Sequence, residues 1–293
     1  MTKQKLITKL KATRDLTPLG WGAKSAIWLS IVAYMASQVI IFLPVGIVYL
    51  VGGKDDVQVF LDDNLWATFG LMALSATTMI AVLYFFLWKR KLGFSNLGFK
   101  KIKLNDIGYV FLFGILYLLI SAILLALASL IPGFDASQEQ EIGFKGVAGW
   151  QLIIVFIGLV IIPPLAEEMV FRGFFYRGLS RGWKNKPVLI GGVFMAGMAS
   201  LFSNNLISGV AIFAITIACI FIAKKSVMLA SAIFVSSIFG LVHGQWNVAI
   251  DTFALSMVLI ALYEKTQNLW ACVGLHALKN LVAFIALFII SGK

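Results

Sequence analysis

The chain has 293 residues, of which 60% are hydrophobic and only 13% are charged, and its mean hydropathy is +0.95. No soluble globular domain of this length has such a composition, so we predict a polytopic membrane protein. The net charge of +11 gathers in segments that flank apolar stretches, without any nucleic-acid motif, so nucleic acid is not expected as a partner. The two cysteines, Cys219 and Cys272, lie inside apolar stretches and are expected to be packing residues.

The first part of the chain predicts a basic cytoplasmic segment, residues 1–26, followed by membrane helices. The first apolar span is too long for a signal peptide and lacks a small-residue cleavage signature, so it is expected to remain as a helix. The acidic residues 52–64 are expected to form a loop, and residues 89–106, with six basic side chains, are the clearest internal loop. The predicted N-terminal transmembrane helices, within a region 27–149, cover about 27–51, 65–88 and 107–131.

The region 150–293 contains further apolar segments, at about 150–165, 188–202, 206–223, 227–243, 248–263 and 269–290. The segments that flank residues 203–205 are short, and one of them could be re-entrant. The predicted fold is therefore all-α, a polytopic transmembrane bundle of about 8–9 helices. Placing the basic loops inside assigns 20 of the 24 lysines and arginines to the cytoplasmic face and puts the N-terminus in the cytoplasm.

Ionisable side chains are rare in the apolar spans. Each costs several kcal/mol in a membrane unless it faces a cavity or a partner, so each indicates a functional site. On a helix, Glu168 and Arg172 lie on one face, where the arginine can neutralise the carboxylate, whereas Glu167 is turned about 100° away. The full set is Glu167, Glu168, Arg172, His243, Asp251, His276 and Lys279.

The double proline Pro163–Pro164 is typical of the first turn of a new helix or of a kink in an old one. In either case Glu167 and Glu168 are expected near a helix start, where free backbone N–H groups favour a carboxylate. One glutamate and two histidines in a protected cavity are a minimal set for activating water. The alternatives are that the Glu–Arg pair is an interfacial anchor and that the histidines are hydrogen-bonding packing residues.

Together these residues resemble the three motifs of the CPBP family of intramembrane proteases, which includes CAAX prenyl endopeptidases and bacteriocin-processing or immunity proteins. The family pattern is EExxxR, then FxxxH, then HxxxN or HxxxD. The chain carries all three in this order within about residues 150–290 and uses both of its histidines. The matching residues are Glu167, Glu168 and Arg172; Phe239 and His243; His276 and Asn280.

The resemblance implies that Glu167 activates the water that attacks a peptide carbonyl. His243 and His276 would assist as metal ligands or as donors to that water, and Asn280 would stabilise the oxyanion. The supporting residues would be Glu168, Arg172 and Phe239. Glu167, His243 and His276 would also suffice for one divalent metal such as Zn²⁺ with an open position, so both a metal and a hydrogen-bonding arrangement stay open.

One feature departs from the family pattern. Members usually have one loop between the first two motifs, whereas 75 positions separate Glu168 from His243 here, so we expect a helical-hairpin insertion near 188–223. In straight helices His243 would lie ~27 Å from the cytoplasmic face and His276 only ~10 Å from it. Strong tilt, a break at Gly240 or a re-entrant segment would bring them together.

The resulting prediction is an integral membrane endopeptidase of the bacterial plasma membrane. Its partners would be the lipid bilayer and a membrane-associated peptide or protein, which it would cleave with glutamate- and histidine-activated water. The alternatives are a non-catalytic immunity or scaffold protein of the same fold and a small proton-coupled transporter. No motif glutamate or histidine is missing, which argues against the first alternative, and no inverted repeat is evident, which argues against the second.

Overall fold

The computed structural model describes residues 19–131, 134, 144, 146–202 and 206–290. In these residues every regular element is helical, and seven stretches are long and apolar enough to cross a membrane, which confirms the predicted helical bundle. The bounds are α2 (Ala23–Asp62), α3 (Leu65–Lys89), α4 (Leu104–Ala128), α5 (Gln151–Phe156), α6 (Ile162–Glu168), α7 (Arg177–Gly182), α8 (Asn185–Phe202), α9 (Leu206–Ala223), α10 (Val227–Leu241), α11 (Trp246–Thr266) and α12 (Leu269–Phe284).

Parts of the predictions fall outside the described residues. Most of the basic N-terminal segment 1–26 does so, since the description begins at residue 19. The residues 203–205 between α8 and α9 also lie outside it, as do most of those between α4 and α5.

The acidic stretch 52–64, predicted to be a loop, is helical up to Asp62. Two helical segments follow one another here and meet in a kink at Gly53, where φ is 85° and ψ is −165°. Glycine adopts this backbone conformation without the penalty that a Cβ imposes. The loop prediction was wrong because charged residues indicate only that a segment is exposed to water. An exposed helix meets that condition as well as a loop does.

The segment Gln151–Gly182 forms one continuous helix, called the central helix below. It contains α5, α6 and α7 and two π-helical stretches, Ile157–Ile161 and Met169–Tyr176. The predicted span ended at residue 165. The helix continues because a π-helical turn, Ile157–Ile161, ends just before Pro163 and Pro164. This wider turn accommodates two residues without a backbone N–H and leaves the helix unbroken.

The two glutamates of the central helix therefore lie near its middle. Glu168 is the last residue of α6 and is followed at once by the second π-helical stretch. The expectation that Glu167 and Glu168 sit near a helix start was wrong, because the double proline continues a helix instead of opening one. First-turn N–H groups are not available to stabilise their carboxylates.

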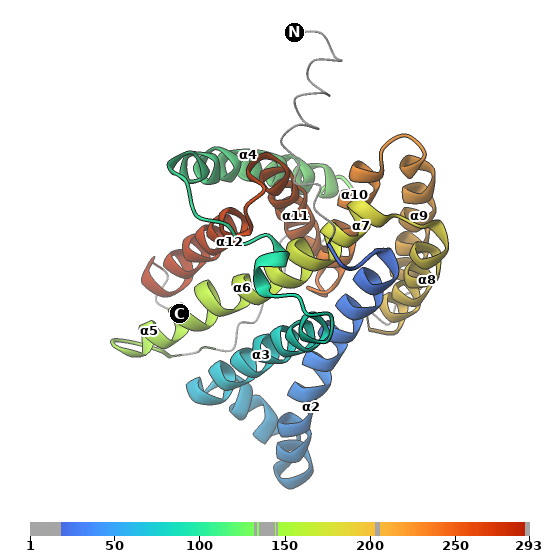
Figure 1. Ribbon diagram of the computed structural model, residues 1–293. Coiled ribbons are helices and arrows are strands. Elements are labelled where there is room, and N and C mark those ends of the chain that lie inside the picture. Colours follow the sequence, from blue (N-terminus) through green and yellow to red (C-terminus); the bar gives the residue numbers. More distant parts are fainter. Residues whose placement is uncertain (1–18, 132–133, 135–143, 145, 203–205, 291–293) are drawn as a thin grey trace.

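The other helices pack around the central helix. In Figure 1 it crosses the middle of the bundle, and the pair α2–α3 lies on one side of it while α4, α11 and α12 lie on the other. The hairpin α8–α9 stands at the edge and packs on α2 and α10. The central helix can therefore present side chains to α10 and α12 at the same time.

The helix that carries the second motif differs from its prediction in one respect. The helix expected at 227–243 ends at Leu241, and His243 lies in the connection before α11 begins at Trp246. Gly244 in this connection has a φ of 78°, which a residue with a side chain adopts at a cost. The break therefore begins directly after Leu241, one residue beyond the Gly240 at which it was considered, and it leaves His243 outside the straight helix.

The close approach of α8 and α9 gives a test of the fold. A Cβ on Gly209 would lie 2.6 Å from the backbone oxygen of Ala196 and 2.0 Å from Oγ of Ser200, so Gly209→Ala forces the helices apart. We expect a loss of about 1–3 kcal/mol, measured as a lower melting temperature in detergent. The matched control is Gly197→Ala in α8, where a Cβ meets nothing within 4 Å and the helix gains propensity. Equal melting temperatures for the two variants would contradict this packing.

Candidate functional site

A buried ion pair lies at the middle of the central helix. Nη1 of Arg172 donates to Oε1 of Glu168 at 2.9 Å, and both side chains are 0% exposed. The pairing follows from their i,i+4 spacing on one helical face. Nε and Nη2 of Arg172 have no hydrogen-bond partner among the described residues, but the guanidinium lies over the Phe239 ring at 4.3 Å. A cation–π contact therefore stabilises the face of the guanidinium, which makes no hydrogen bond to the carboxylate.

His276 of α12 is the second partner of this carboxylate. Its Nδ1 lies 2.9 Å from Oε1 of Glu168, and the ring is buried. A carboxylate that is paired with Arg172 is ionised and only accepts hydrogen bonds, so Nδ1 carries the hydrogen. The other nitrogen, Nε2, is then an acceptor in the neutral ring and points toward Glu167, whose Oε2 lies 3.9 Å away.

Phe239 of α10 connects the three motifs. Its ring lies 5.0 Å from the ring of His243 and 6.0 Å from that of His276, both edge to face. On a further side it meets Phe171 at 4.9 Å, next to Arg172 in the central helix. One fully buried aromatic ring therefore sets the spacing between the two histidines and the arginine.

His243 is held by the end of its own helix. Its Nδ1 lies 2.7 Å from the carbonyl oxygen of Phe239, one turn earlier. A carbonyl accepts only, so Nδ1 donates and Nε2 is left as an acceptor. The carbonyls of the last helical turn lack intrahelical partners, and the spacing of the FxxxH motif lets the histidine satisfy one of them. His243 also lies close enough to Glu167, His276 and Lys279 to interact with each of them electrostatically.

Asn280 makes a hydrogen bond that the double proline explains. Its Nδ2 donates to the carbonyl oxygen of Leu159 at 2.9 Å. In a regular helix this carbonyl would accept from the residue four positions later, and in a π-helix from the one five later, but these are Pro163 and Pro164, which have no N–H. One hydrogen of the Asn280 amide is thus used to satisfy an orphaned carbonyl, and the second remains for another acceptor.

Glu167 is the least constrained member of the group. Its side chain is 22% exposed, and its buried oxygen Oε2 has no hydrogen-bond partner among the described residues. Glu167 also lies close enough to Tyr34 of α2 to interact with it electrostatically. The Tyr34 hydroxyl donates a hydrogen bond to the carbonyl oxygen of Val242 at 3.1 Å. The sequence contained no signal for Tyr34, because a tyrosine in an apolar span is typical of packing.

Asp251 and Lys279 form a polar cluster beside the site. Oδ1 of Asp251 accepts hydrogen bonds from Tyr117 at 2.7 Å and from Ser121 at 2.5 Å, and Oδ2 lies 3.8 Å from Nζ of Lys279. Because α10 ends at Leu241 and α11 begins at Trp246, Asp251 and His243 do not lie on one helix. Asp251 instead links α4, α11 and α12.

The metal expected from the motifs has a suitable set of donor atoms, namely two Nε2 acceptors and one carboxylate. Among the described residues, however, no group of three or more His, Cys, Asp or Glu side chains lies close enough together to hold a metal ion.

The fold and the site define a polytopic helical membrane protein in which the glutamate pair of the central helix meets His276 of α12 and His243 of the α10–α11 connection inside the bundle. Residues 149–234 and 222–282 match the family described as type II CAAX prenyl endopeptidase, Rce1-like. This match supports the assignment of that part of the chain to the CAAX (CPBP) protease family and agrees with the resemblance drawn from the three motifs. No curated protein and no solved structure matches the chain.

Removing one charge of the buried ion pair tests its role in the fold. Arg172→Met leaves Glu168 as a buried carboxylate without its cation, and we expect a loss of about 3–5 kcal/mol in the free energy of unfolding. The double variant Glu168→Met/Arg172→Met removes both charges and should melt at a higher temperature in detergent than Arg172→Met alone. A single variant as stable as the wild type would contradict the pairing.

Proposed function

We propose that the protein is an intramembrane endopeptidase that hydrolyses a peptide bond of a membrane-associated peptide or protein. The observation that carries this proposal is the position of Glu167, a carboxylate beside Nε2 of a histidine whose other nitrogen is fixed by a second carboxylate. The 3.9 Å between Oε2 of Glu167 and Nε2 of His276 is too long for a direct hydrogen bond and suits a water held by both. Membership of a protease family supports the same chemistry.

In the proposed reaction Glu167 is the general base. Its carboxylate takes a proton from the water as the oxygen attacks the peptide carbonyl carbon. The second hydrogen of that water makes a hydrogen bond to Nε2 of His276. This bond orients the oxygen lone pair away from the two side chains. Glu167 then returns its proton to the peptide nitrogen, the C–N bond breaks, and a carboxylic acid and an amine result.

The remaining motif residues would position the reactants. Asn280 would donate its second amide hydrogen to the oxyanion of the tetrahedral intermediate. Because its first hydrogen is bonded to Leu159, the amide plane is fixed before substrate arrives. His243 would complete the polar surroundings of Glu167, since its ring lies close enough to that carboxylate to interact with it electrostatically and is held in place by the bond from Nδ1 to the Phe239 carbonyl.

Glu167→Gln tests this function. The amide cannot accept a proton from water, so we expect cleavage to fall by about 10²–10⁴-fold or more while the protein folds normally. The measurement compares membrane peptidomes of cells that carry the wild-type or the variant protein. Asp55→Asn, which removes an exposed carboxylate from α2, is the control and should change nothing.

Two outcomes would contradict the proposed function. Cleavage that survives Glu167→Gln or His276→Ala in purified protein would leave these residues without the roles given to them. Transport activity that is lost in the same variants, without any proteolysis, would favour a proton relay instead.

The requirement for a divalent ion such as Zn²⁺ stays a prediction of the motif resemblance. Elemental analysis of the purified wild-type protein and of His243→Ala checks it. One ion per chain in the wild type and none in the variant would confirm the prediction, and the same metal content in both would contradict a site that uses His243.

A further inference from the structure

The two ends of the bundle differ strongly in charge. The connections α3–α4, α7–α8, α9–α10 and α11–α12, with the helix ends beside them, carry twelve lysines and arginines, and we call this the basic end. Hydrogen bonds tie these connections together: Lys100 N donates to Oδ1 of Asn268 at 3.2 Å, and the Arg177 guanidinium donates to the carbonyl oxygen of Asn96. At the opposite end Lys54 is the one basic side chain of the described residues.

The charge difference sets the orientation in the membrane. Lysine and arginine gather in cytoplasmic loops, so the basic end faces the cytoplasm. The opposite end carries the exposed Asp55, Asp56 and Asp63 near the α2–α3 connection, which belongs on the other side of the membrane.

Between the site and the basic end the bundle is closed. Every residue of the central helix from Glu168 to Ser180 is buried. Aromatic pairs fill the space toward α10 and α11: Phe175 meets Phe234 at 6.1 Å, and Tyr176 meets Tyr263 at 6.4 Å. These four rings are each at most 2% exposed. A peptide that approached from the cytoplasm would have to separate packed helices to reach Glu167.

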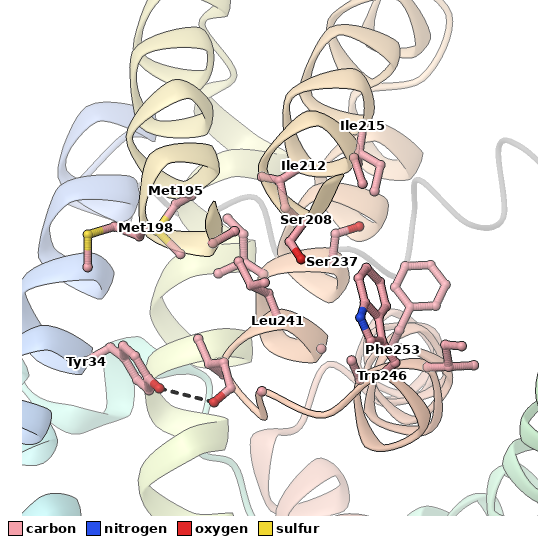
Figure 2. Close-up of a pocket in the computed structure, with 18 of the residues that line it drawn as sticks. Tyr34, Met195, Met198, Ser208, Ile212, Ile215, Ser237, Leu241, Trp246 and Phe253 are labelled. Carbon is pink, nitrogen blue, oxygen red and sulfur yellow. Dashed lines mark hydrogen bonds between the residues drawn. The ribbon is translucent and has the colours of Figure 1, made fainter. Parts of the chain in front are cut away.

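Toward the opposite end the packing is open. Glu167 is partly exposed, and the connection that carries His243 lies at the far end of α10, about 22 Å from the start of that helix near Lys225. A mainly apolar cavity of about 660 Å³ adjoins this connection. Its lining includes Tyr34, which also lies within range of Glu167, and Figure 2 shows the Tyr34 hydroxyl bonded to the chain beside Leu241.

The cavity lies mainly in the half of the bundle away from the basic end, and it reaches Phe171 and Phe175 of the central helix. It is lined by Leu127 at the end of α4, by Met198 near the end of α8, by Ser208 near the start of α9 and by Trp246 at the start of α11. All four positions lie far from the basic connections along their own helices. The space next to the site is therefore on the side opposite the cytoplasm.

We propose that the site opens to the non-cytoplasmic side and takes exported, membrane-associated peptides, whose apolar segment occupies the cavity while the bond to be cleaved reaches Glu167. This proposal rests on the proposed endopeptidase function. It separates the chain from proteases that act on the C-termini of prenylated proteins in the cytoplasm. The closed aromatic layer indicates toward which end of the bundle the site opens, and the charge of the loops indicates which side of the membrane that end faces.

Cysteine labelling in intact cells tests the orientation without requiring any activity. The background replaces the two buried native cysteines by Cys219→Ala and Cys272→Ala. Trp246→Cys, at a 47% exposed position, reports on the mouth of the site; Asp55→Cys and Lys101→Cys report on the two ends of the bundle. The probe is a sulfonated maleimide that does not cross membranes.

We expect Trp246→Cys and Asp55→Cys to be labelled in intact cells, and Lys101→Cys only after permeabilisation. If Trp246→Cys is labelled under the same condition as Lys101→Cys, the proposal is overturned. Inversion of the whole pattern would also overturn it. So would a Trp246→Cys that reacts in neither intact nor permeabilised cells. If Trp246→Cys does not accumulate, Gln245→Cys in the same connection gives the same readout.

The peptidome comparison separates this proposal from the proposed function. Peptides that depend on Glu167 should be recovered outside the cytoplasm. The expected labelling without any cleavage that depends on Glu167 would refute the endopeptidase and leave the orientation standing. Cleavage of cytoplasmic peptides alone that depends on Glu167 would refute the orientation and leave the endopeptidase standing.

Discussion

The arrangement of the site depends on the ion pair between Glu168 and Arg172. Two charges inside an apolar bundle are tolerable only when each has a partner, because neither water nor lipid headgroups reach them. The pair also fixes its neighbours: the carboxylate binds Nδ1 of His276, and the guanidinium rests on Phe239, whose ring meets His243. The first motif thereby positions residues of the second and third, while the buried Oε2 of Glu167 has no hydrogen-bond partner among the described residues.

The irregular backbone of the central helix is the second constraint. The π-helical turn before Pro163 and Pro164 keeps the helix continuous and leaves the Leu159 carbonyl to Asn280. Departures from regular helix geometry concentrate at functional sites, where the cost is offset by the groups they place. Here the departure ties the central helix to α12 through Asn280, one turn beyond His276 in that helix.

The bundle is asymmetric about the site. Aromatic packing closes it toward the basic end, and an apolar cavity lies beside it on the other side. The hairpin α8–α9 contributes part of the cavity wall, so the extra length between the first two motifs has a structural consequence for the space next to the site. Function and topology are linked here, because the direction of opening decides which peptides can arrive.

The sequence by itself determined the helical membrane fold, because apolar spans of sufficient length and basic loops are local features. It also indicated the Glu168–Arg172 pair, since the i,i+4 spacing is a property of any helix. It could not place His243 and His276 at a common level: straight-helix counting separated them, and only the early end of α10 at Leu241 together with the packing of Phe239 brings them to one site. The continuity of the central helix through two prolines and the bond from Asn280 to Leu159 were likewise decided by tertiary structure, because they depend on a partner helix more than one hundred residues away in the chain.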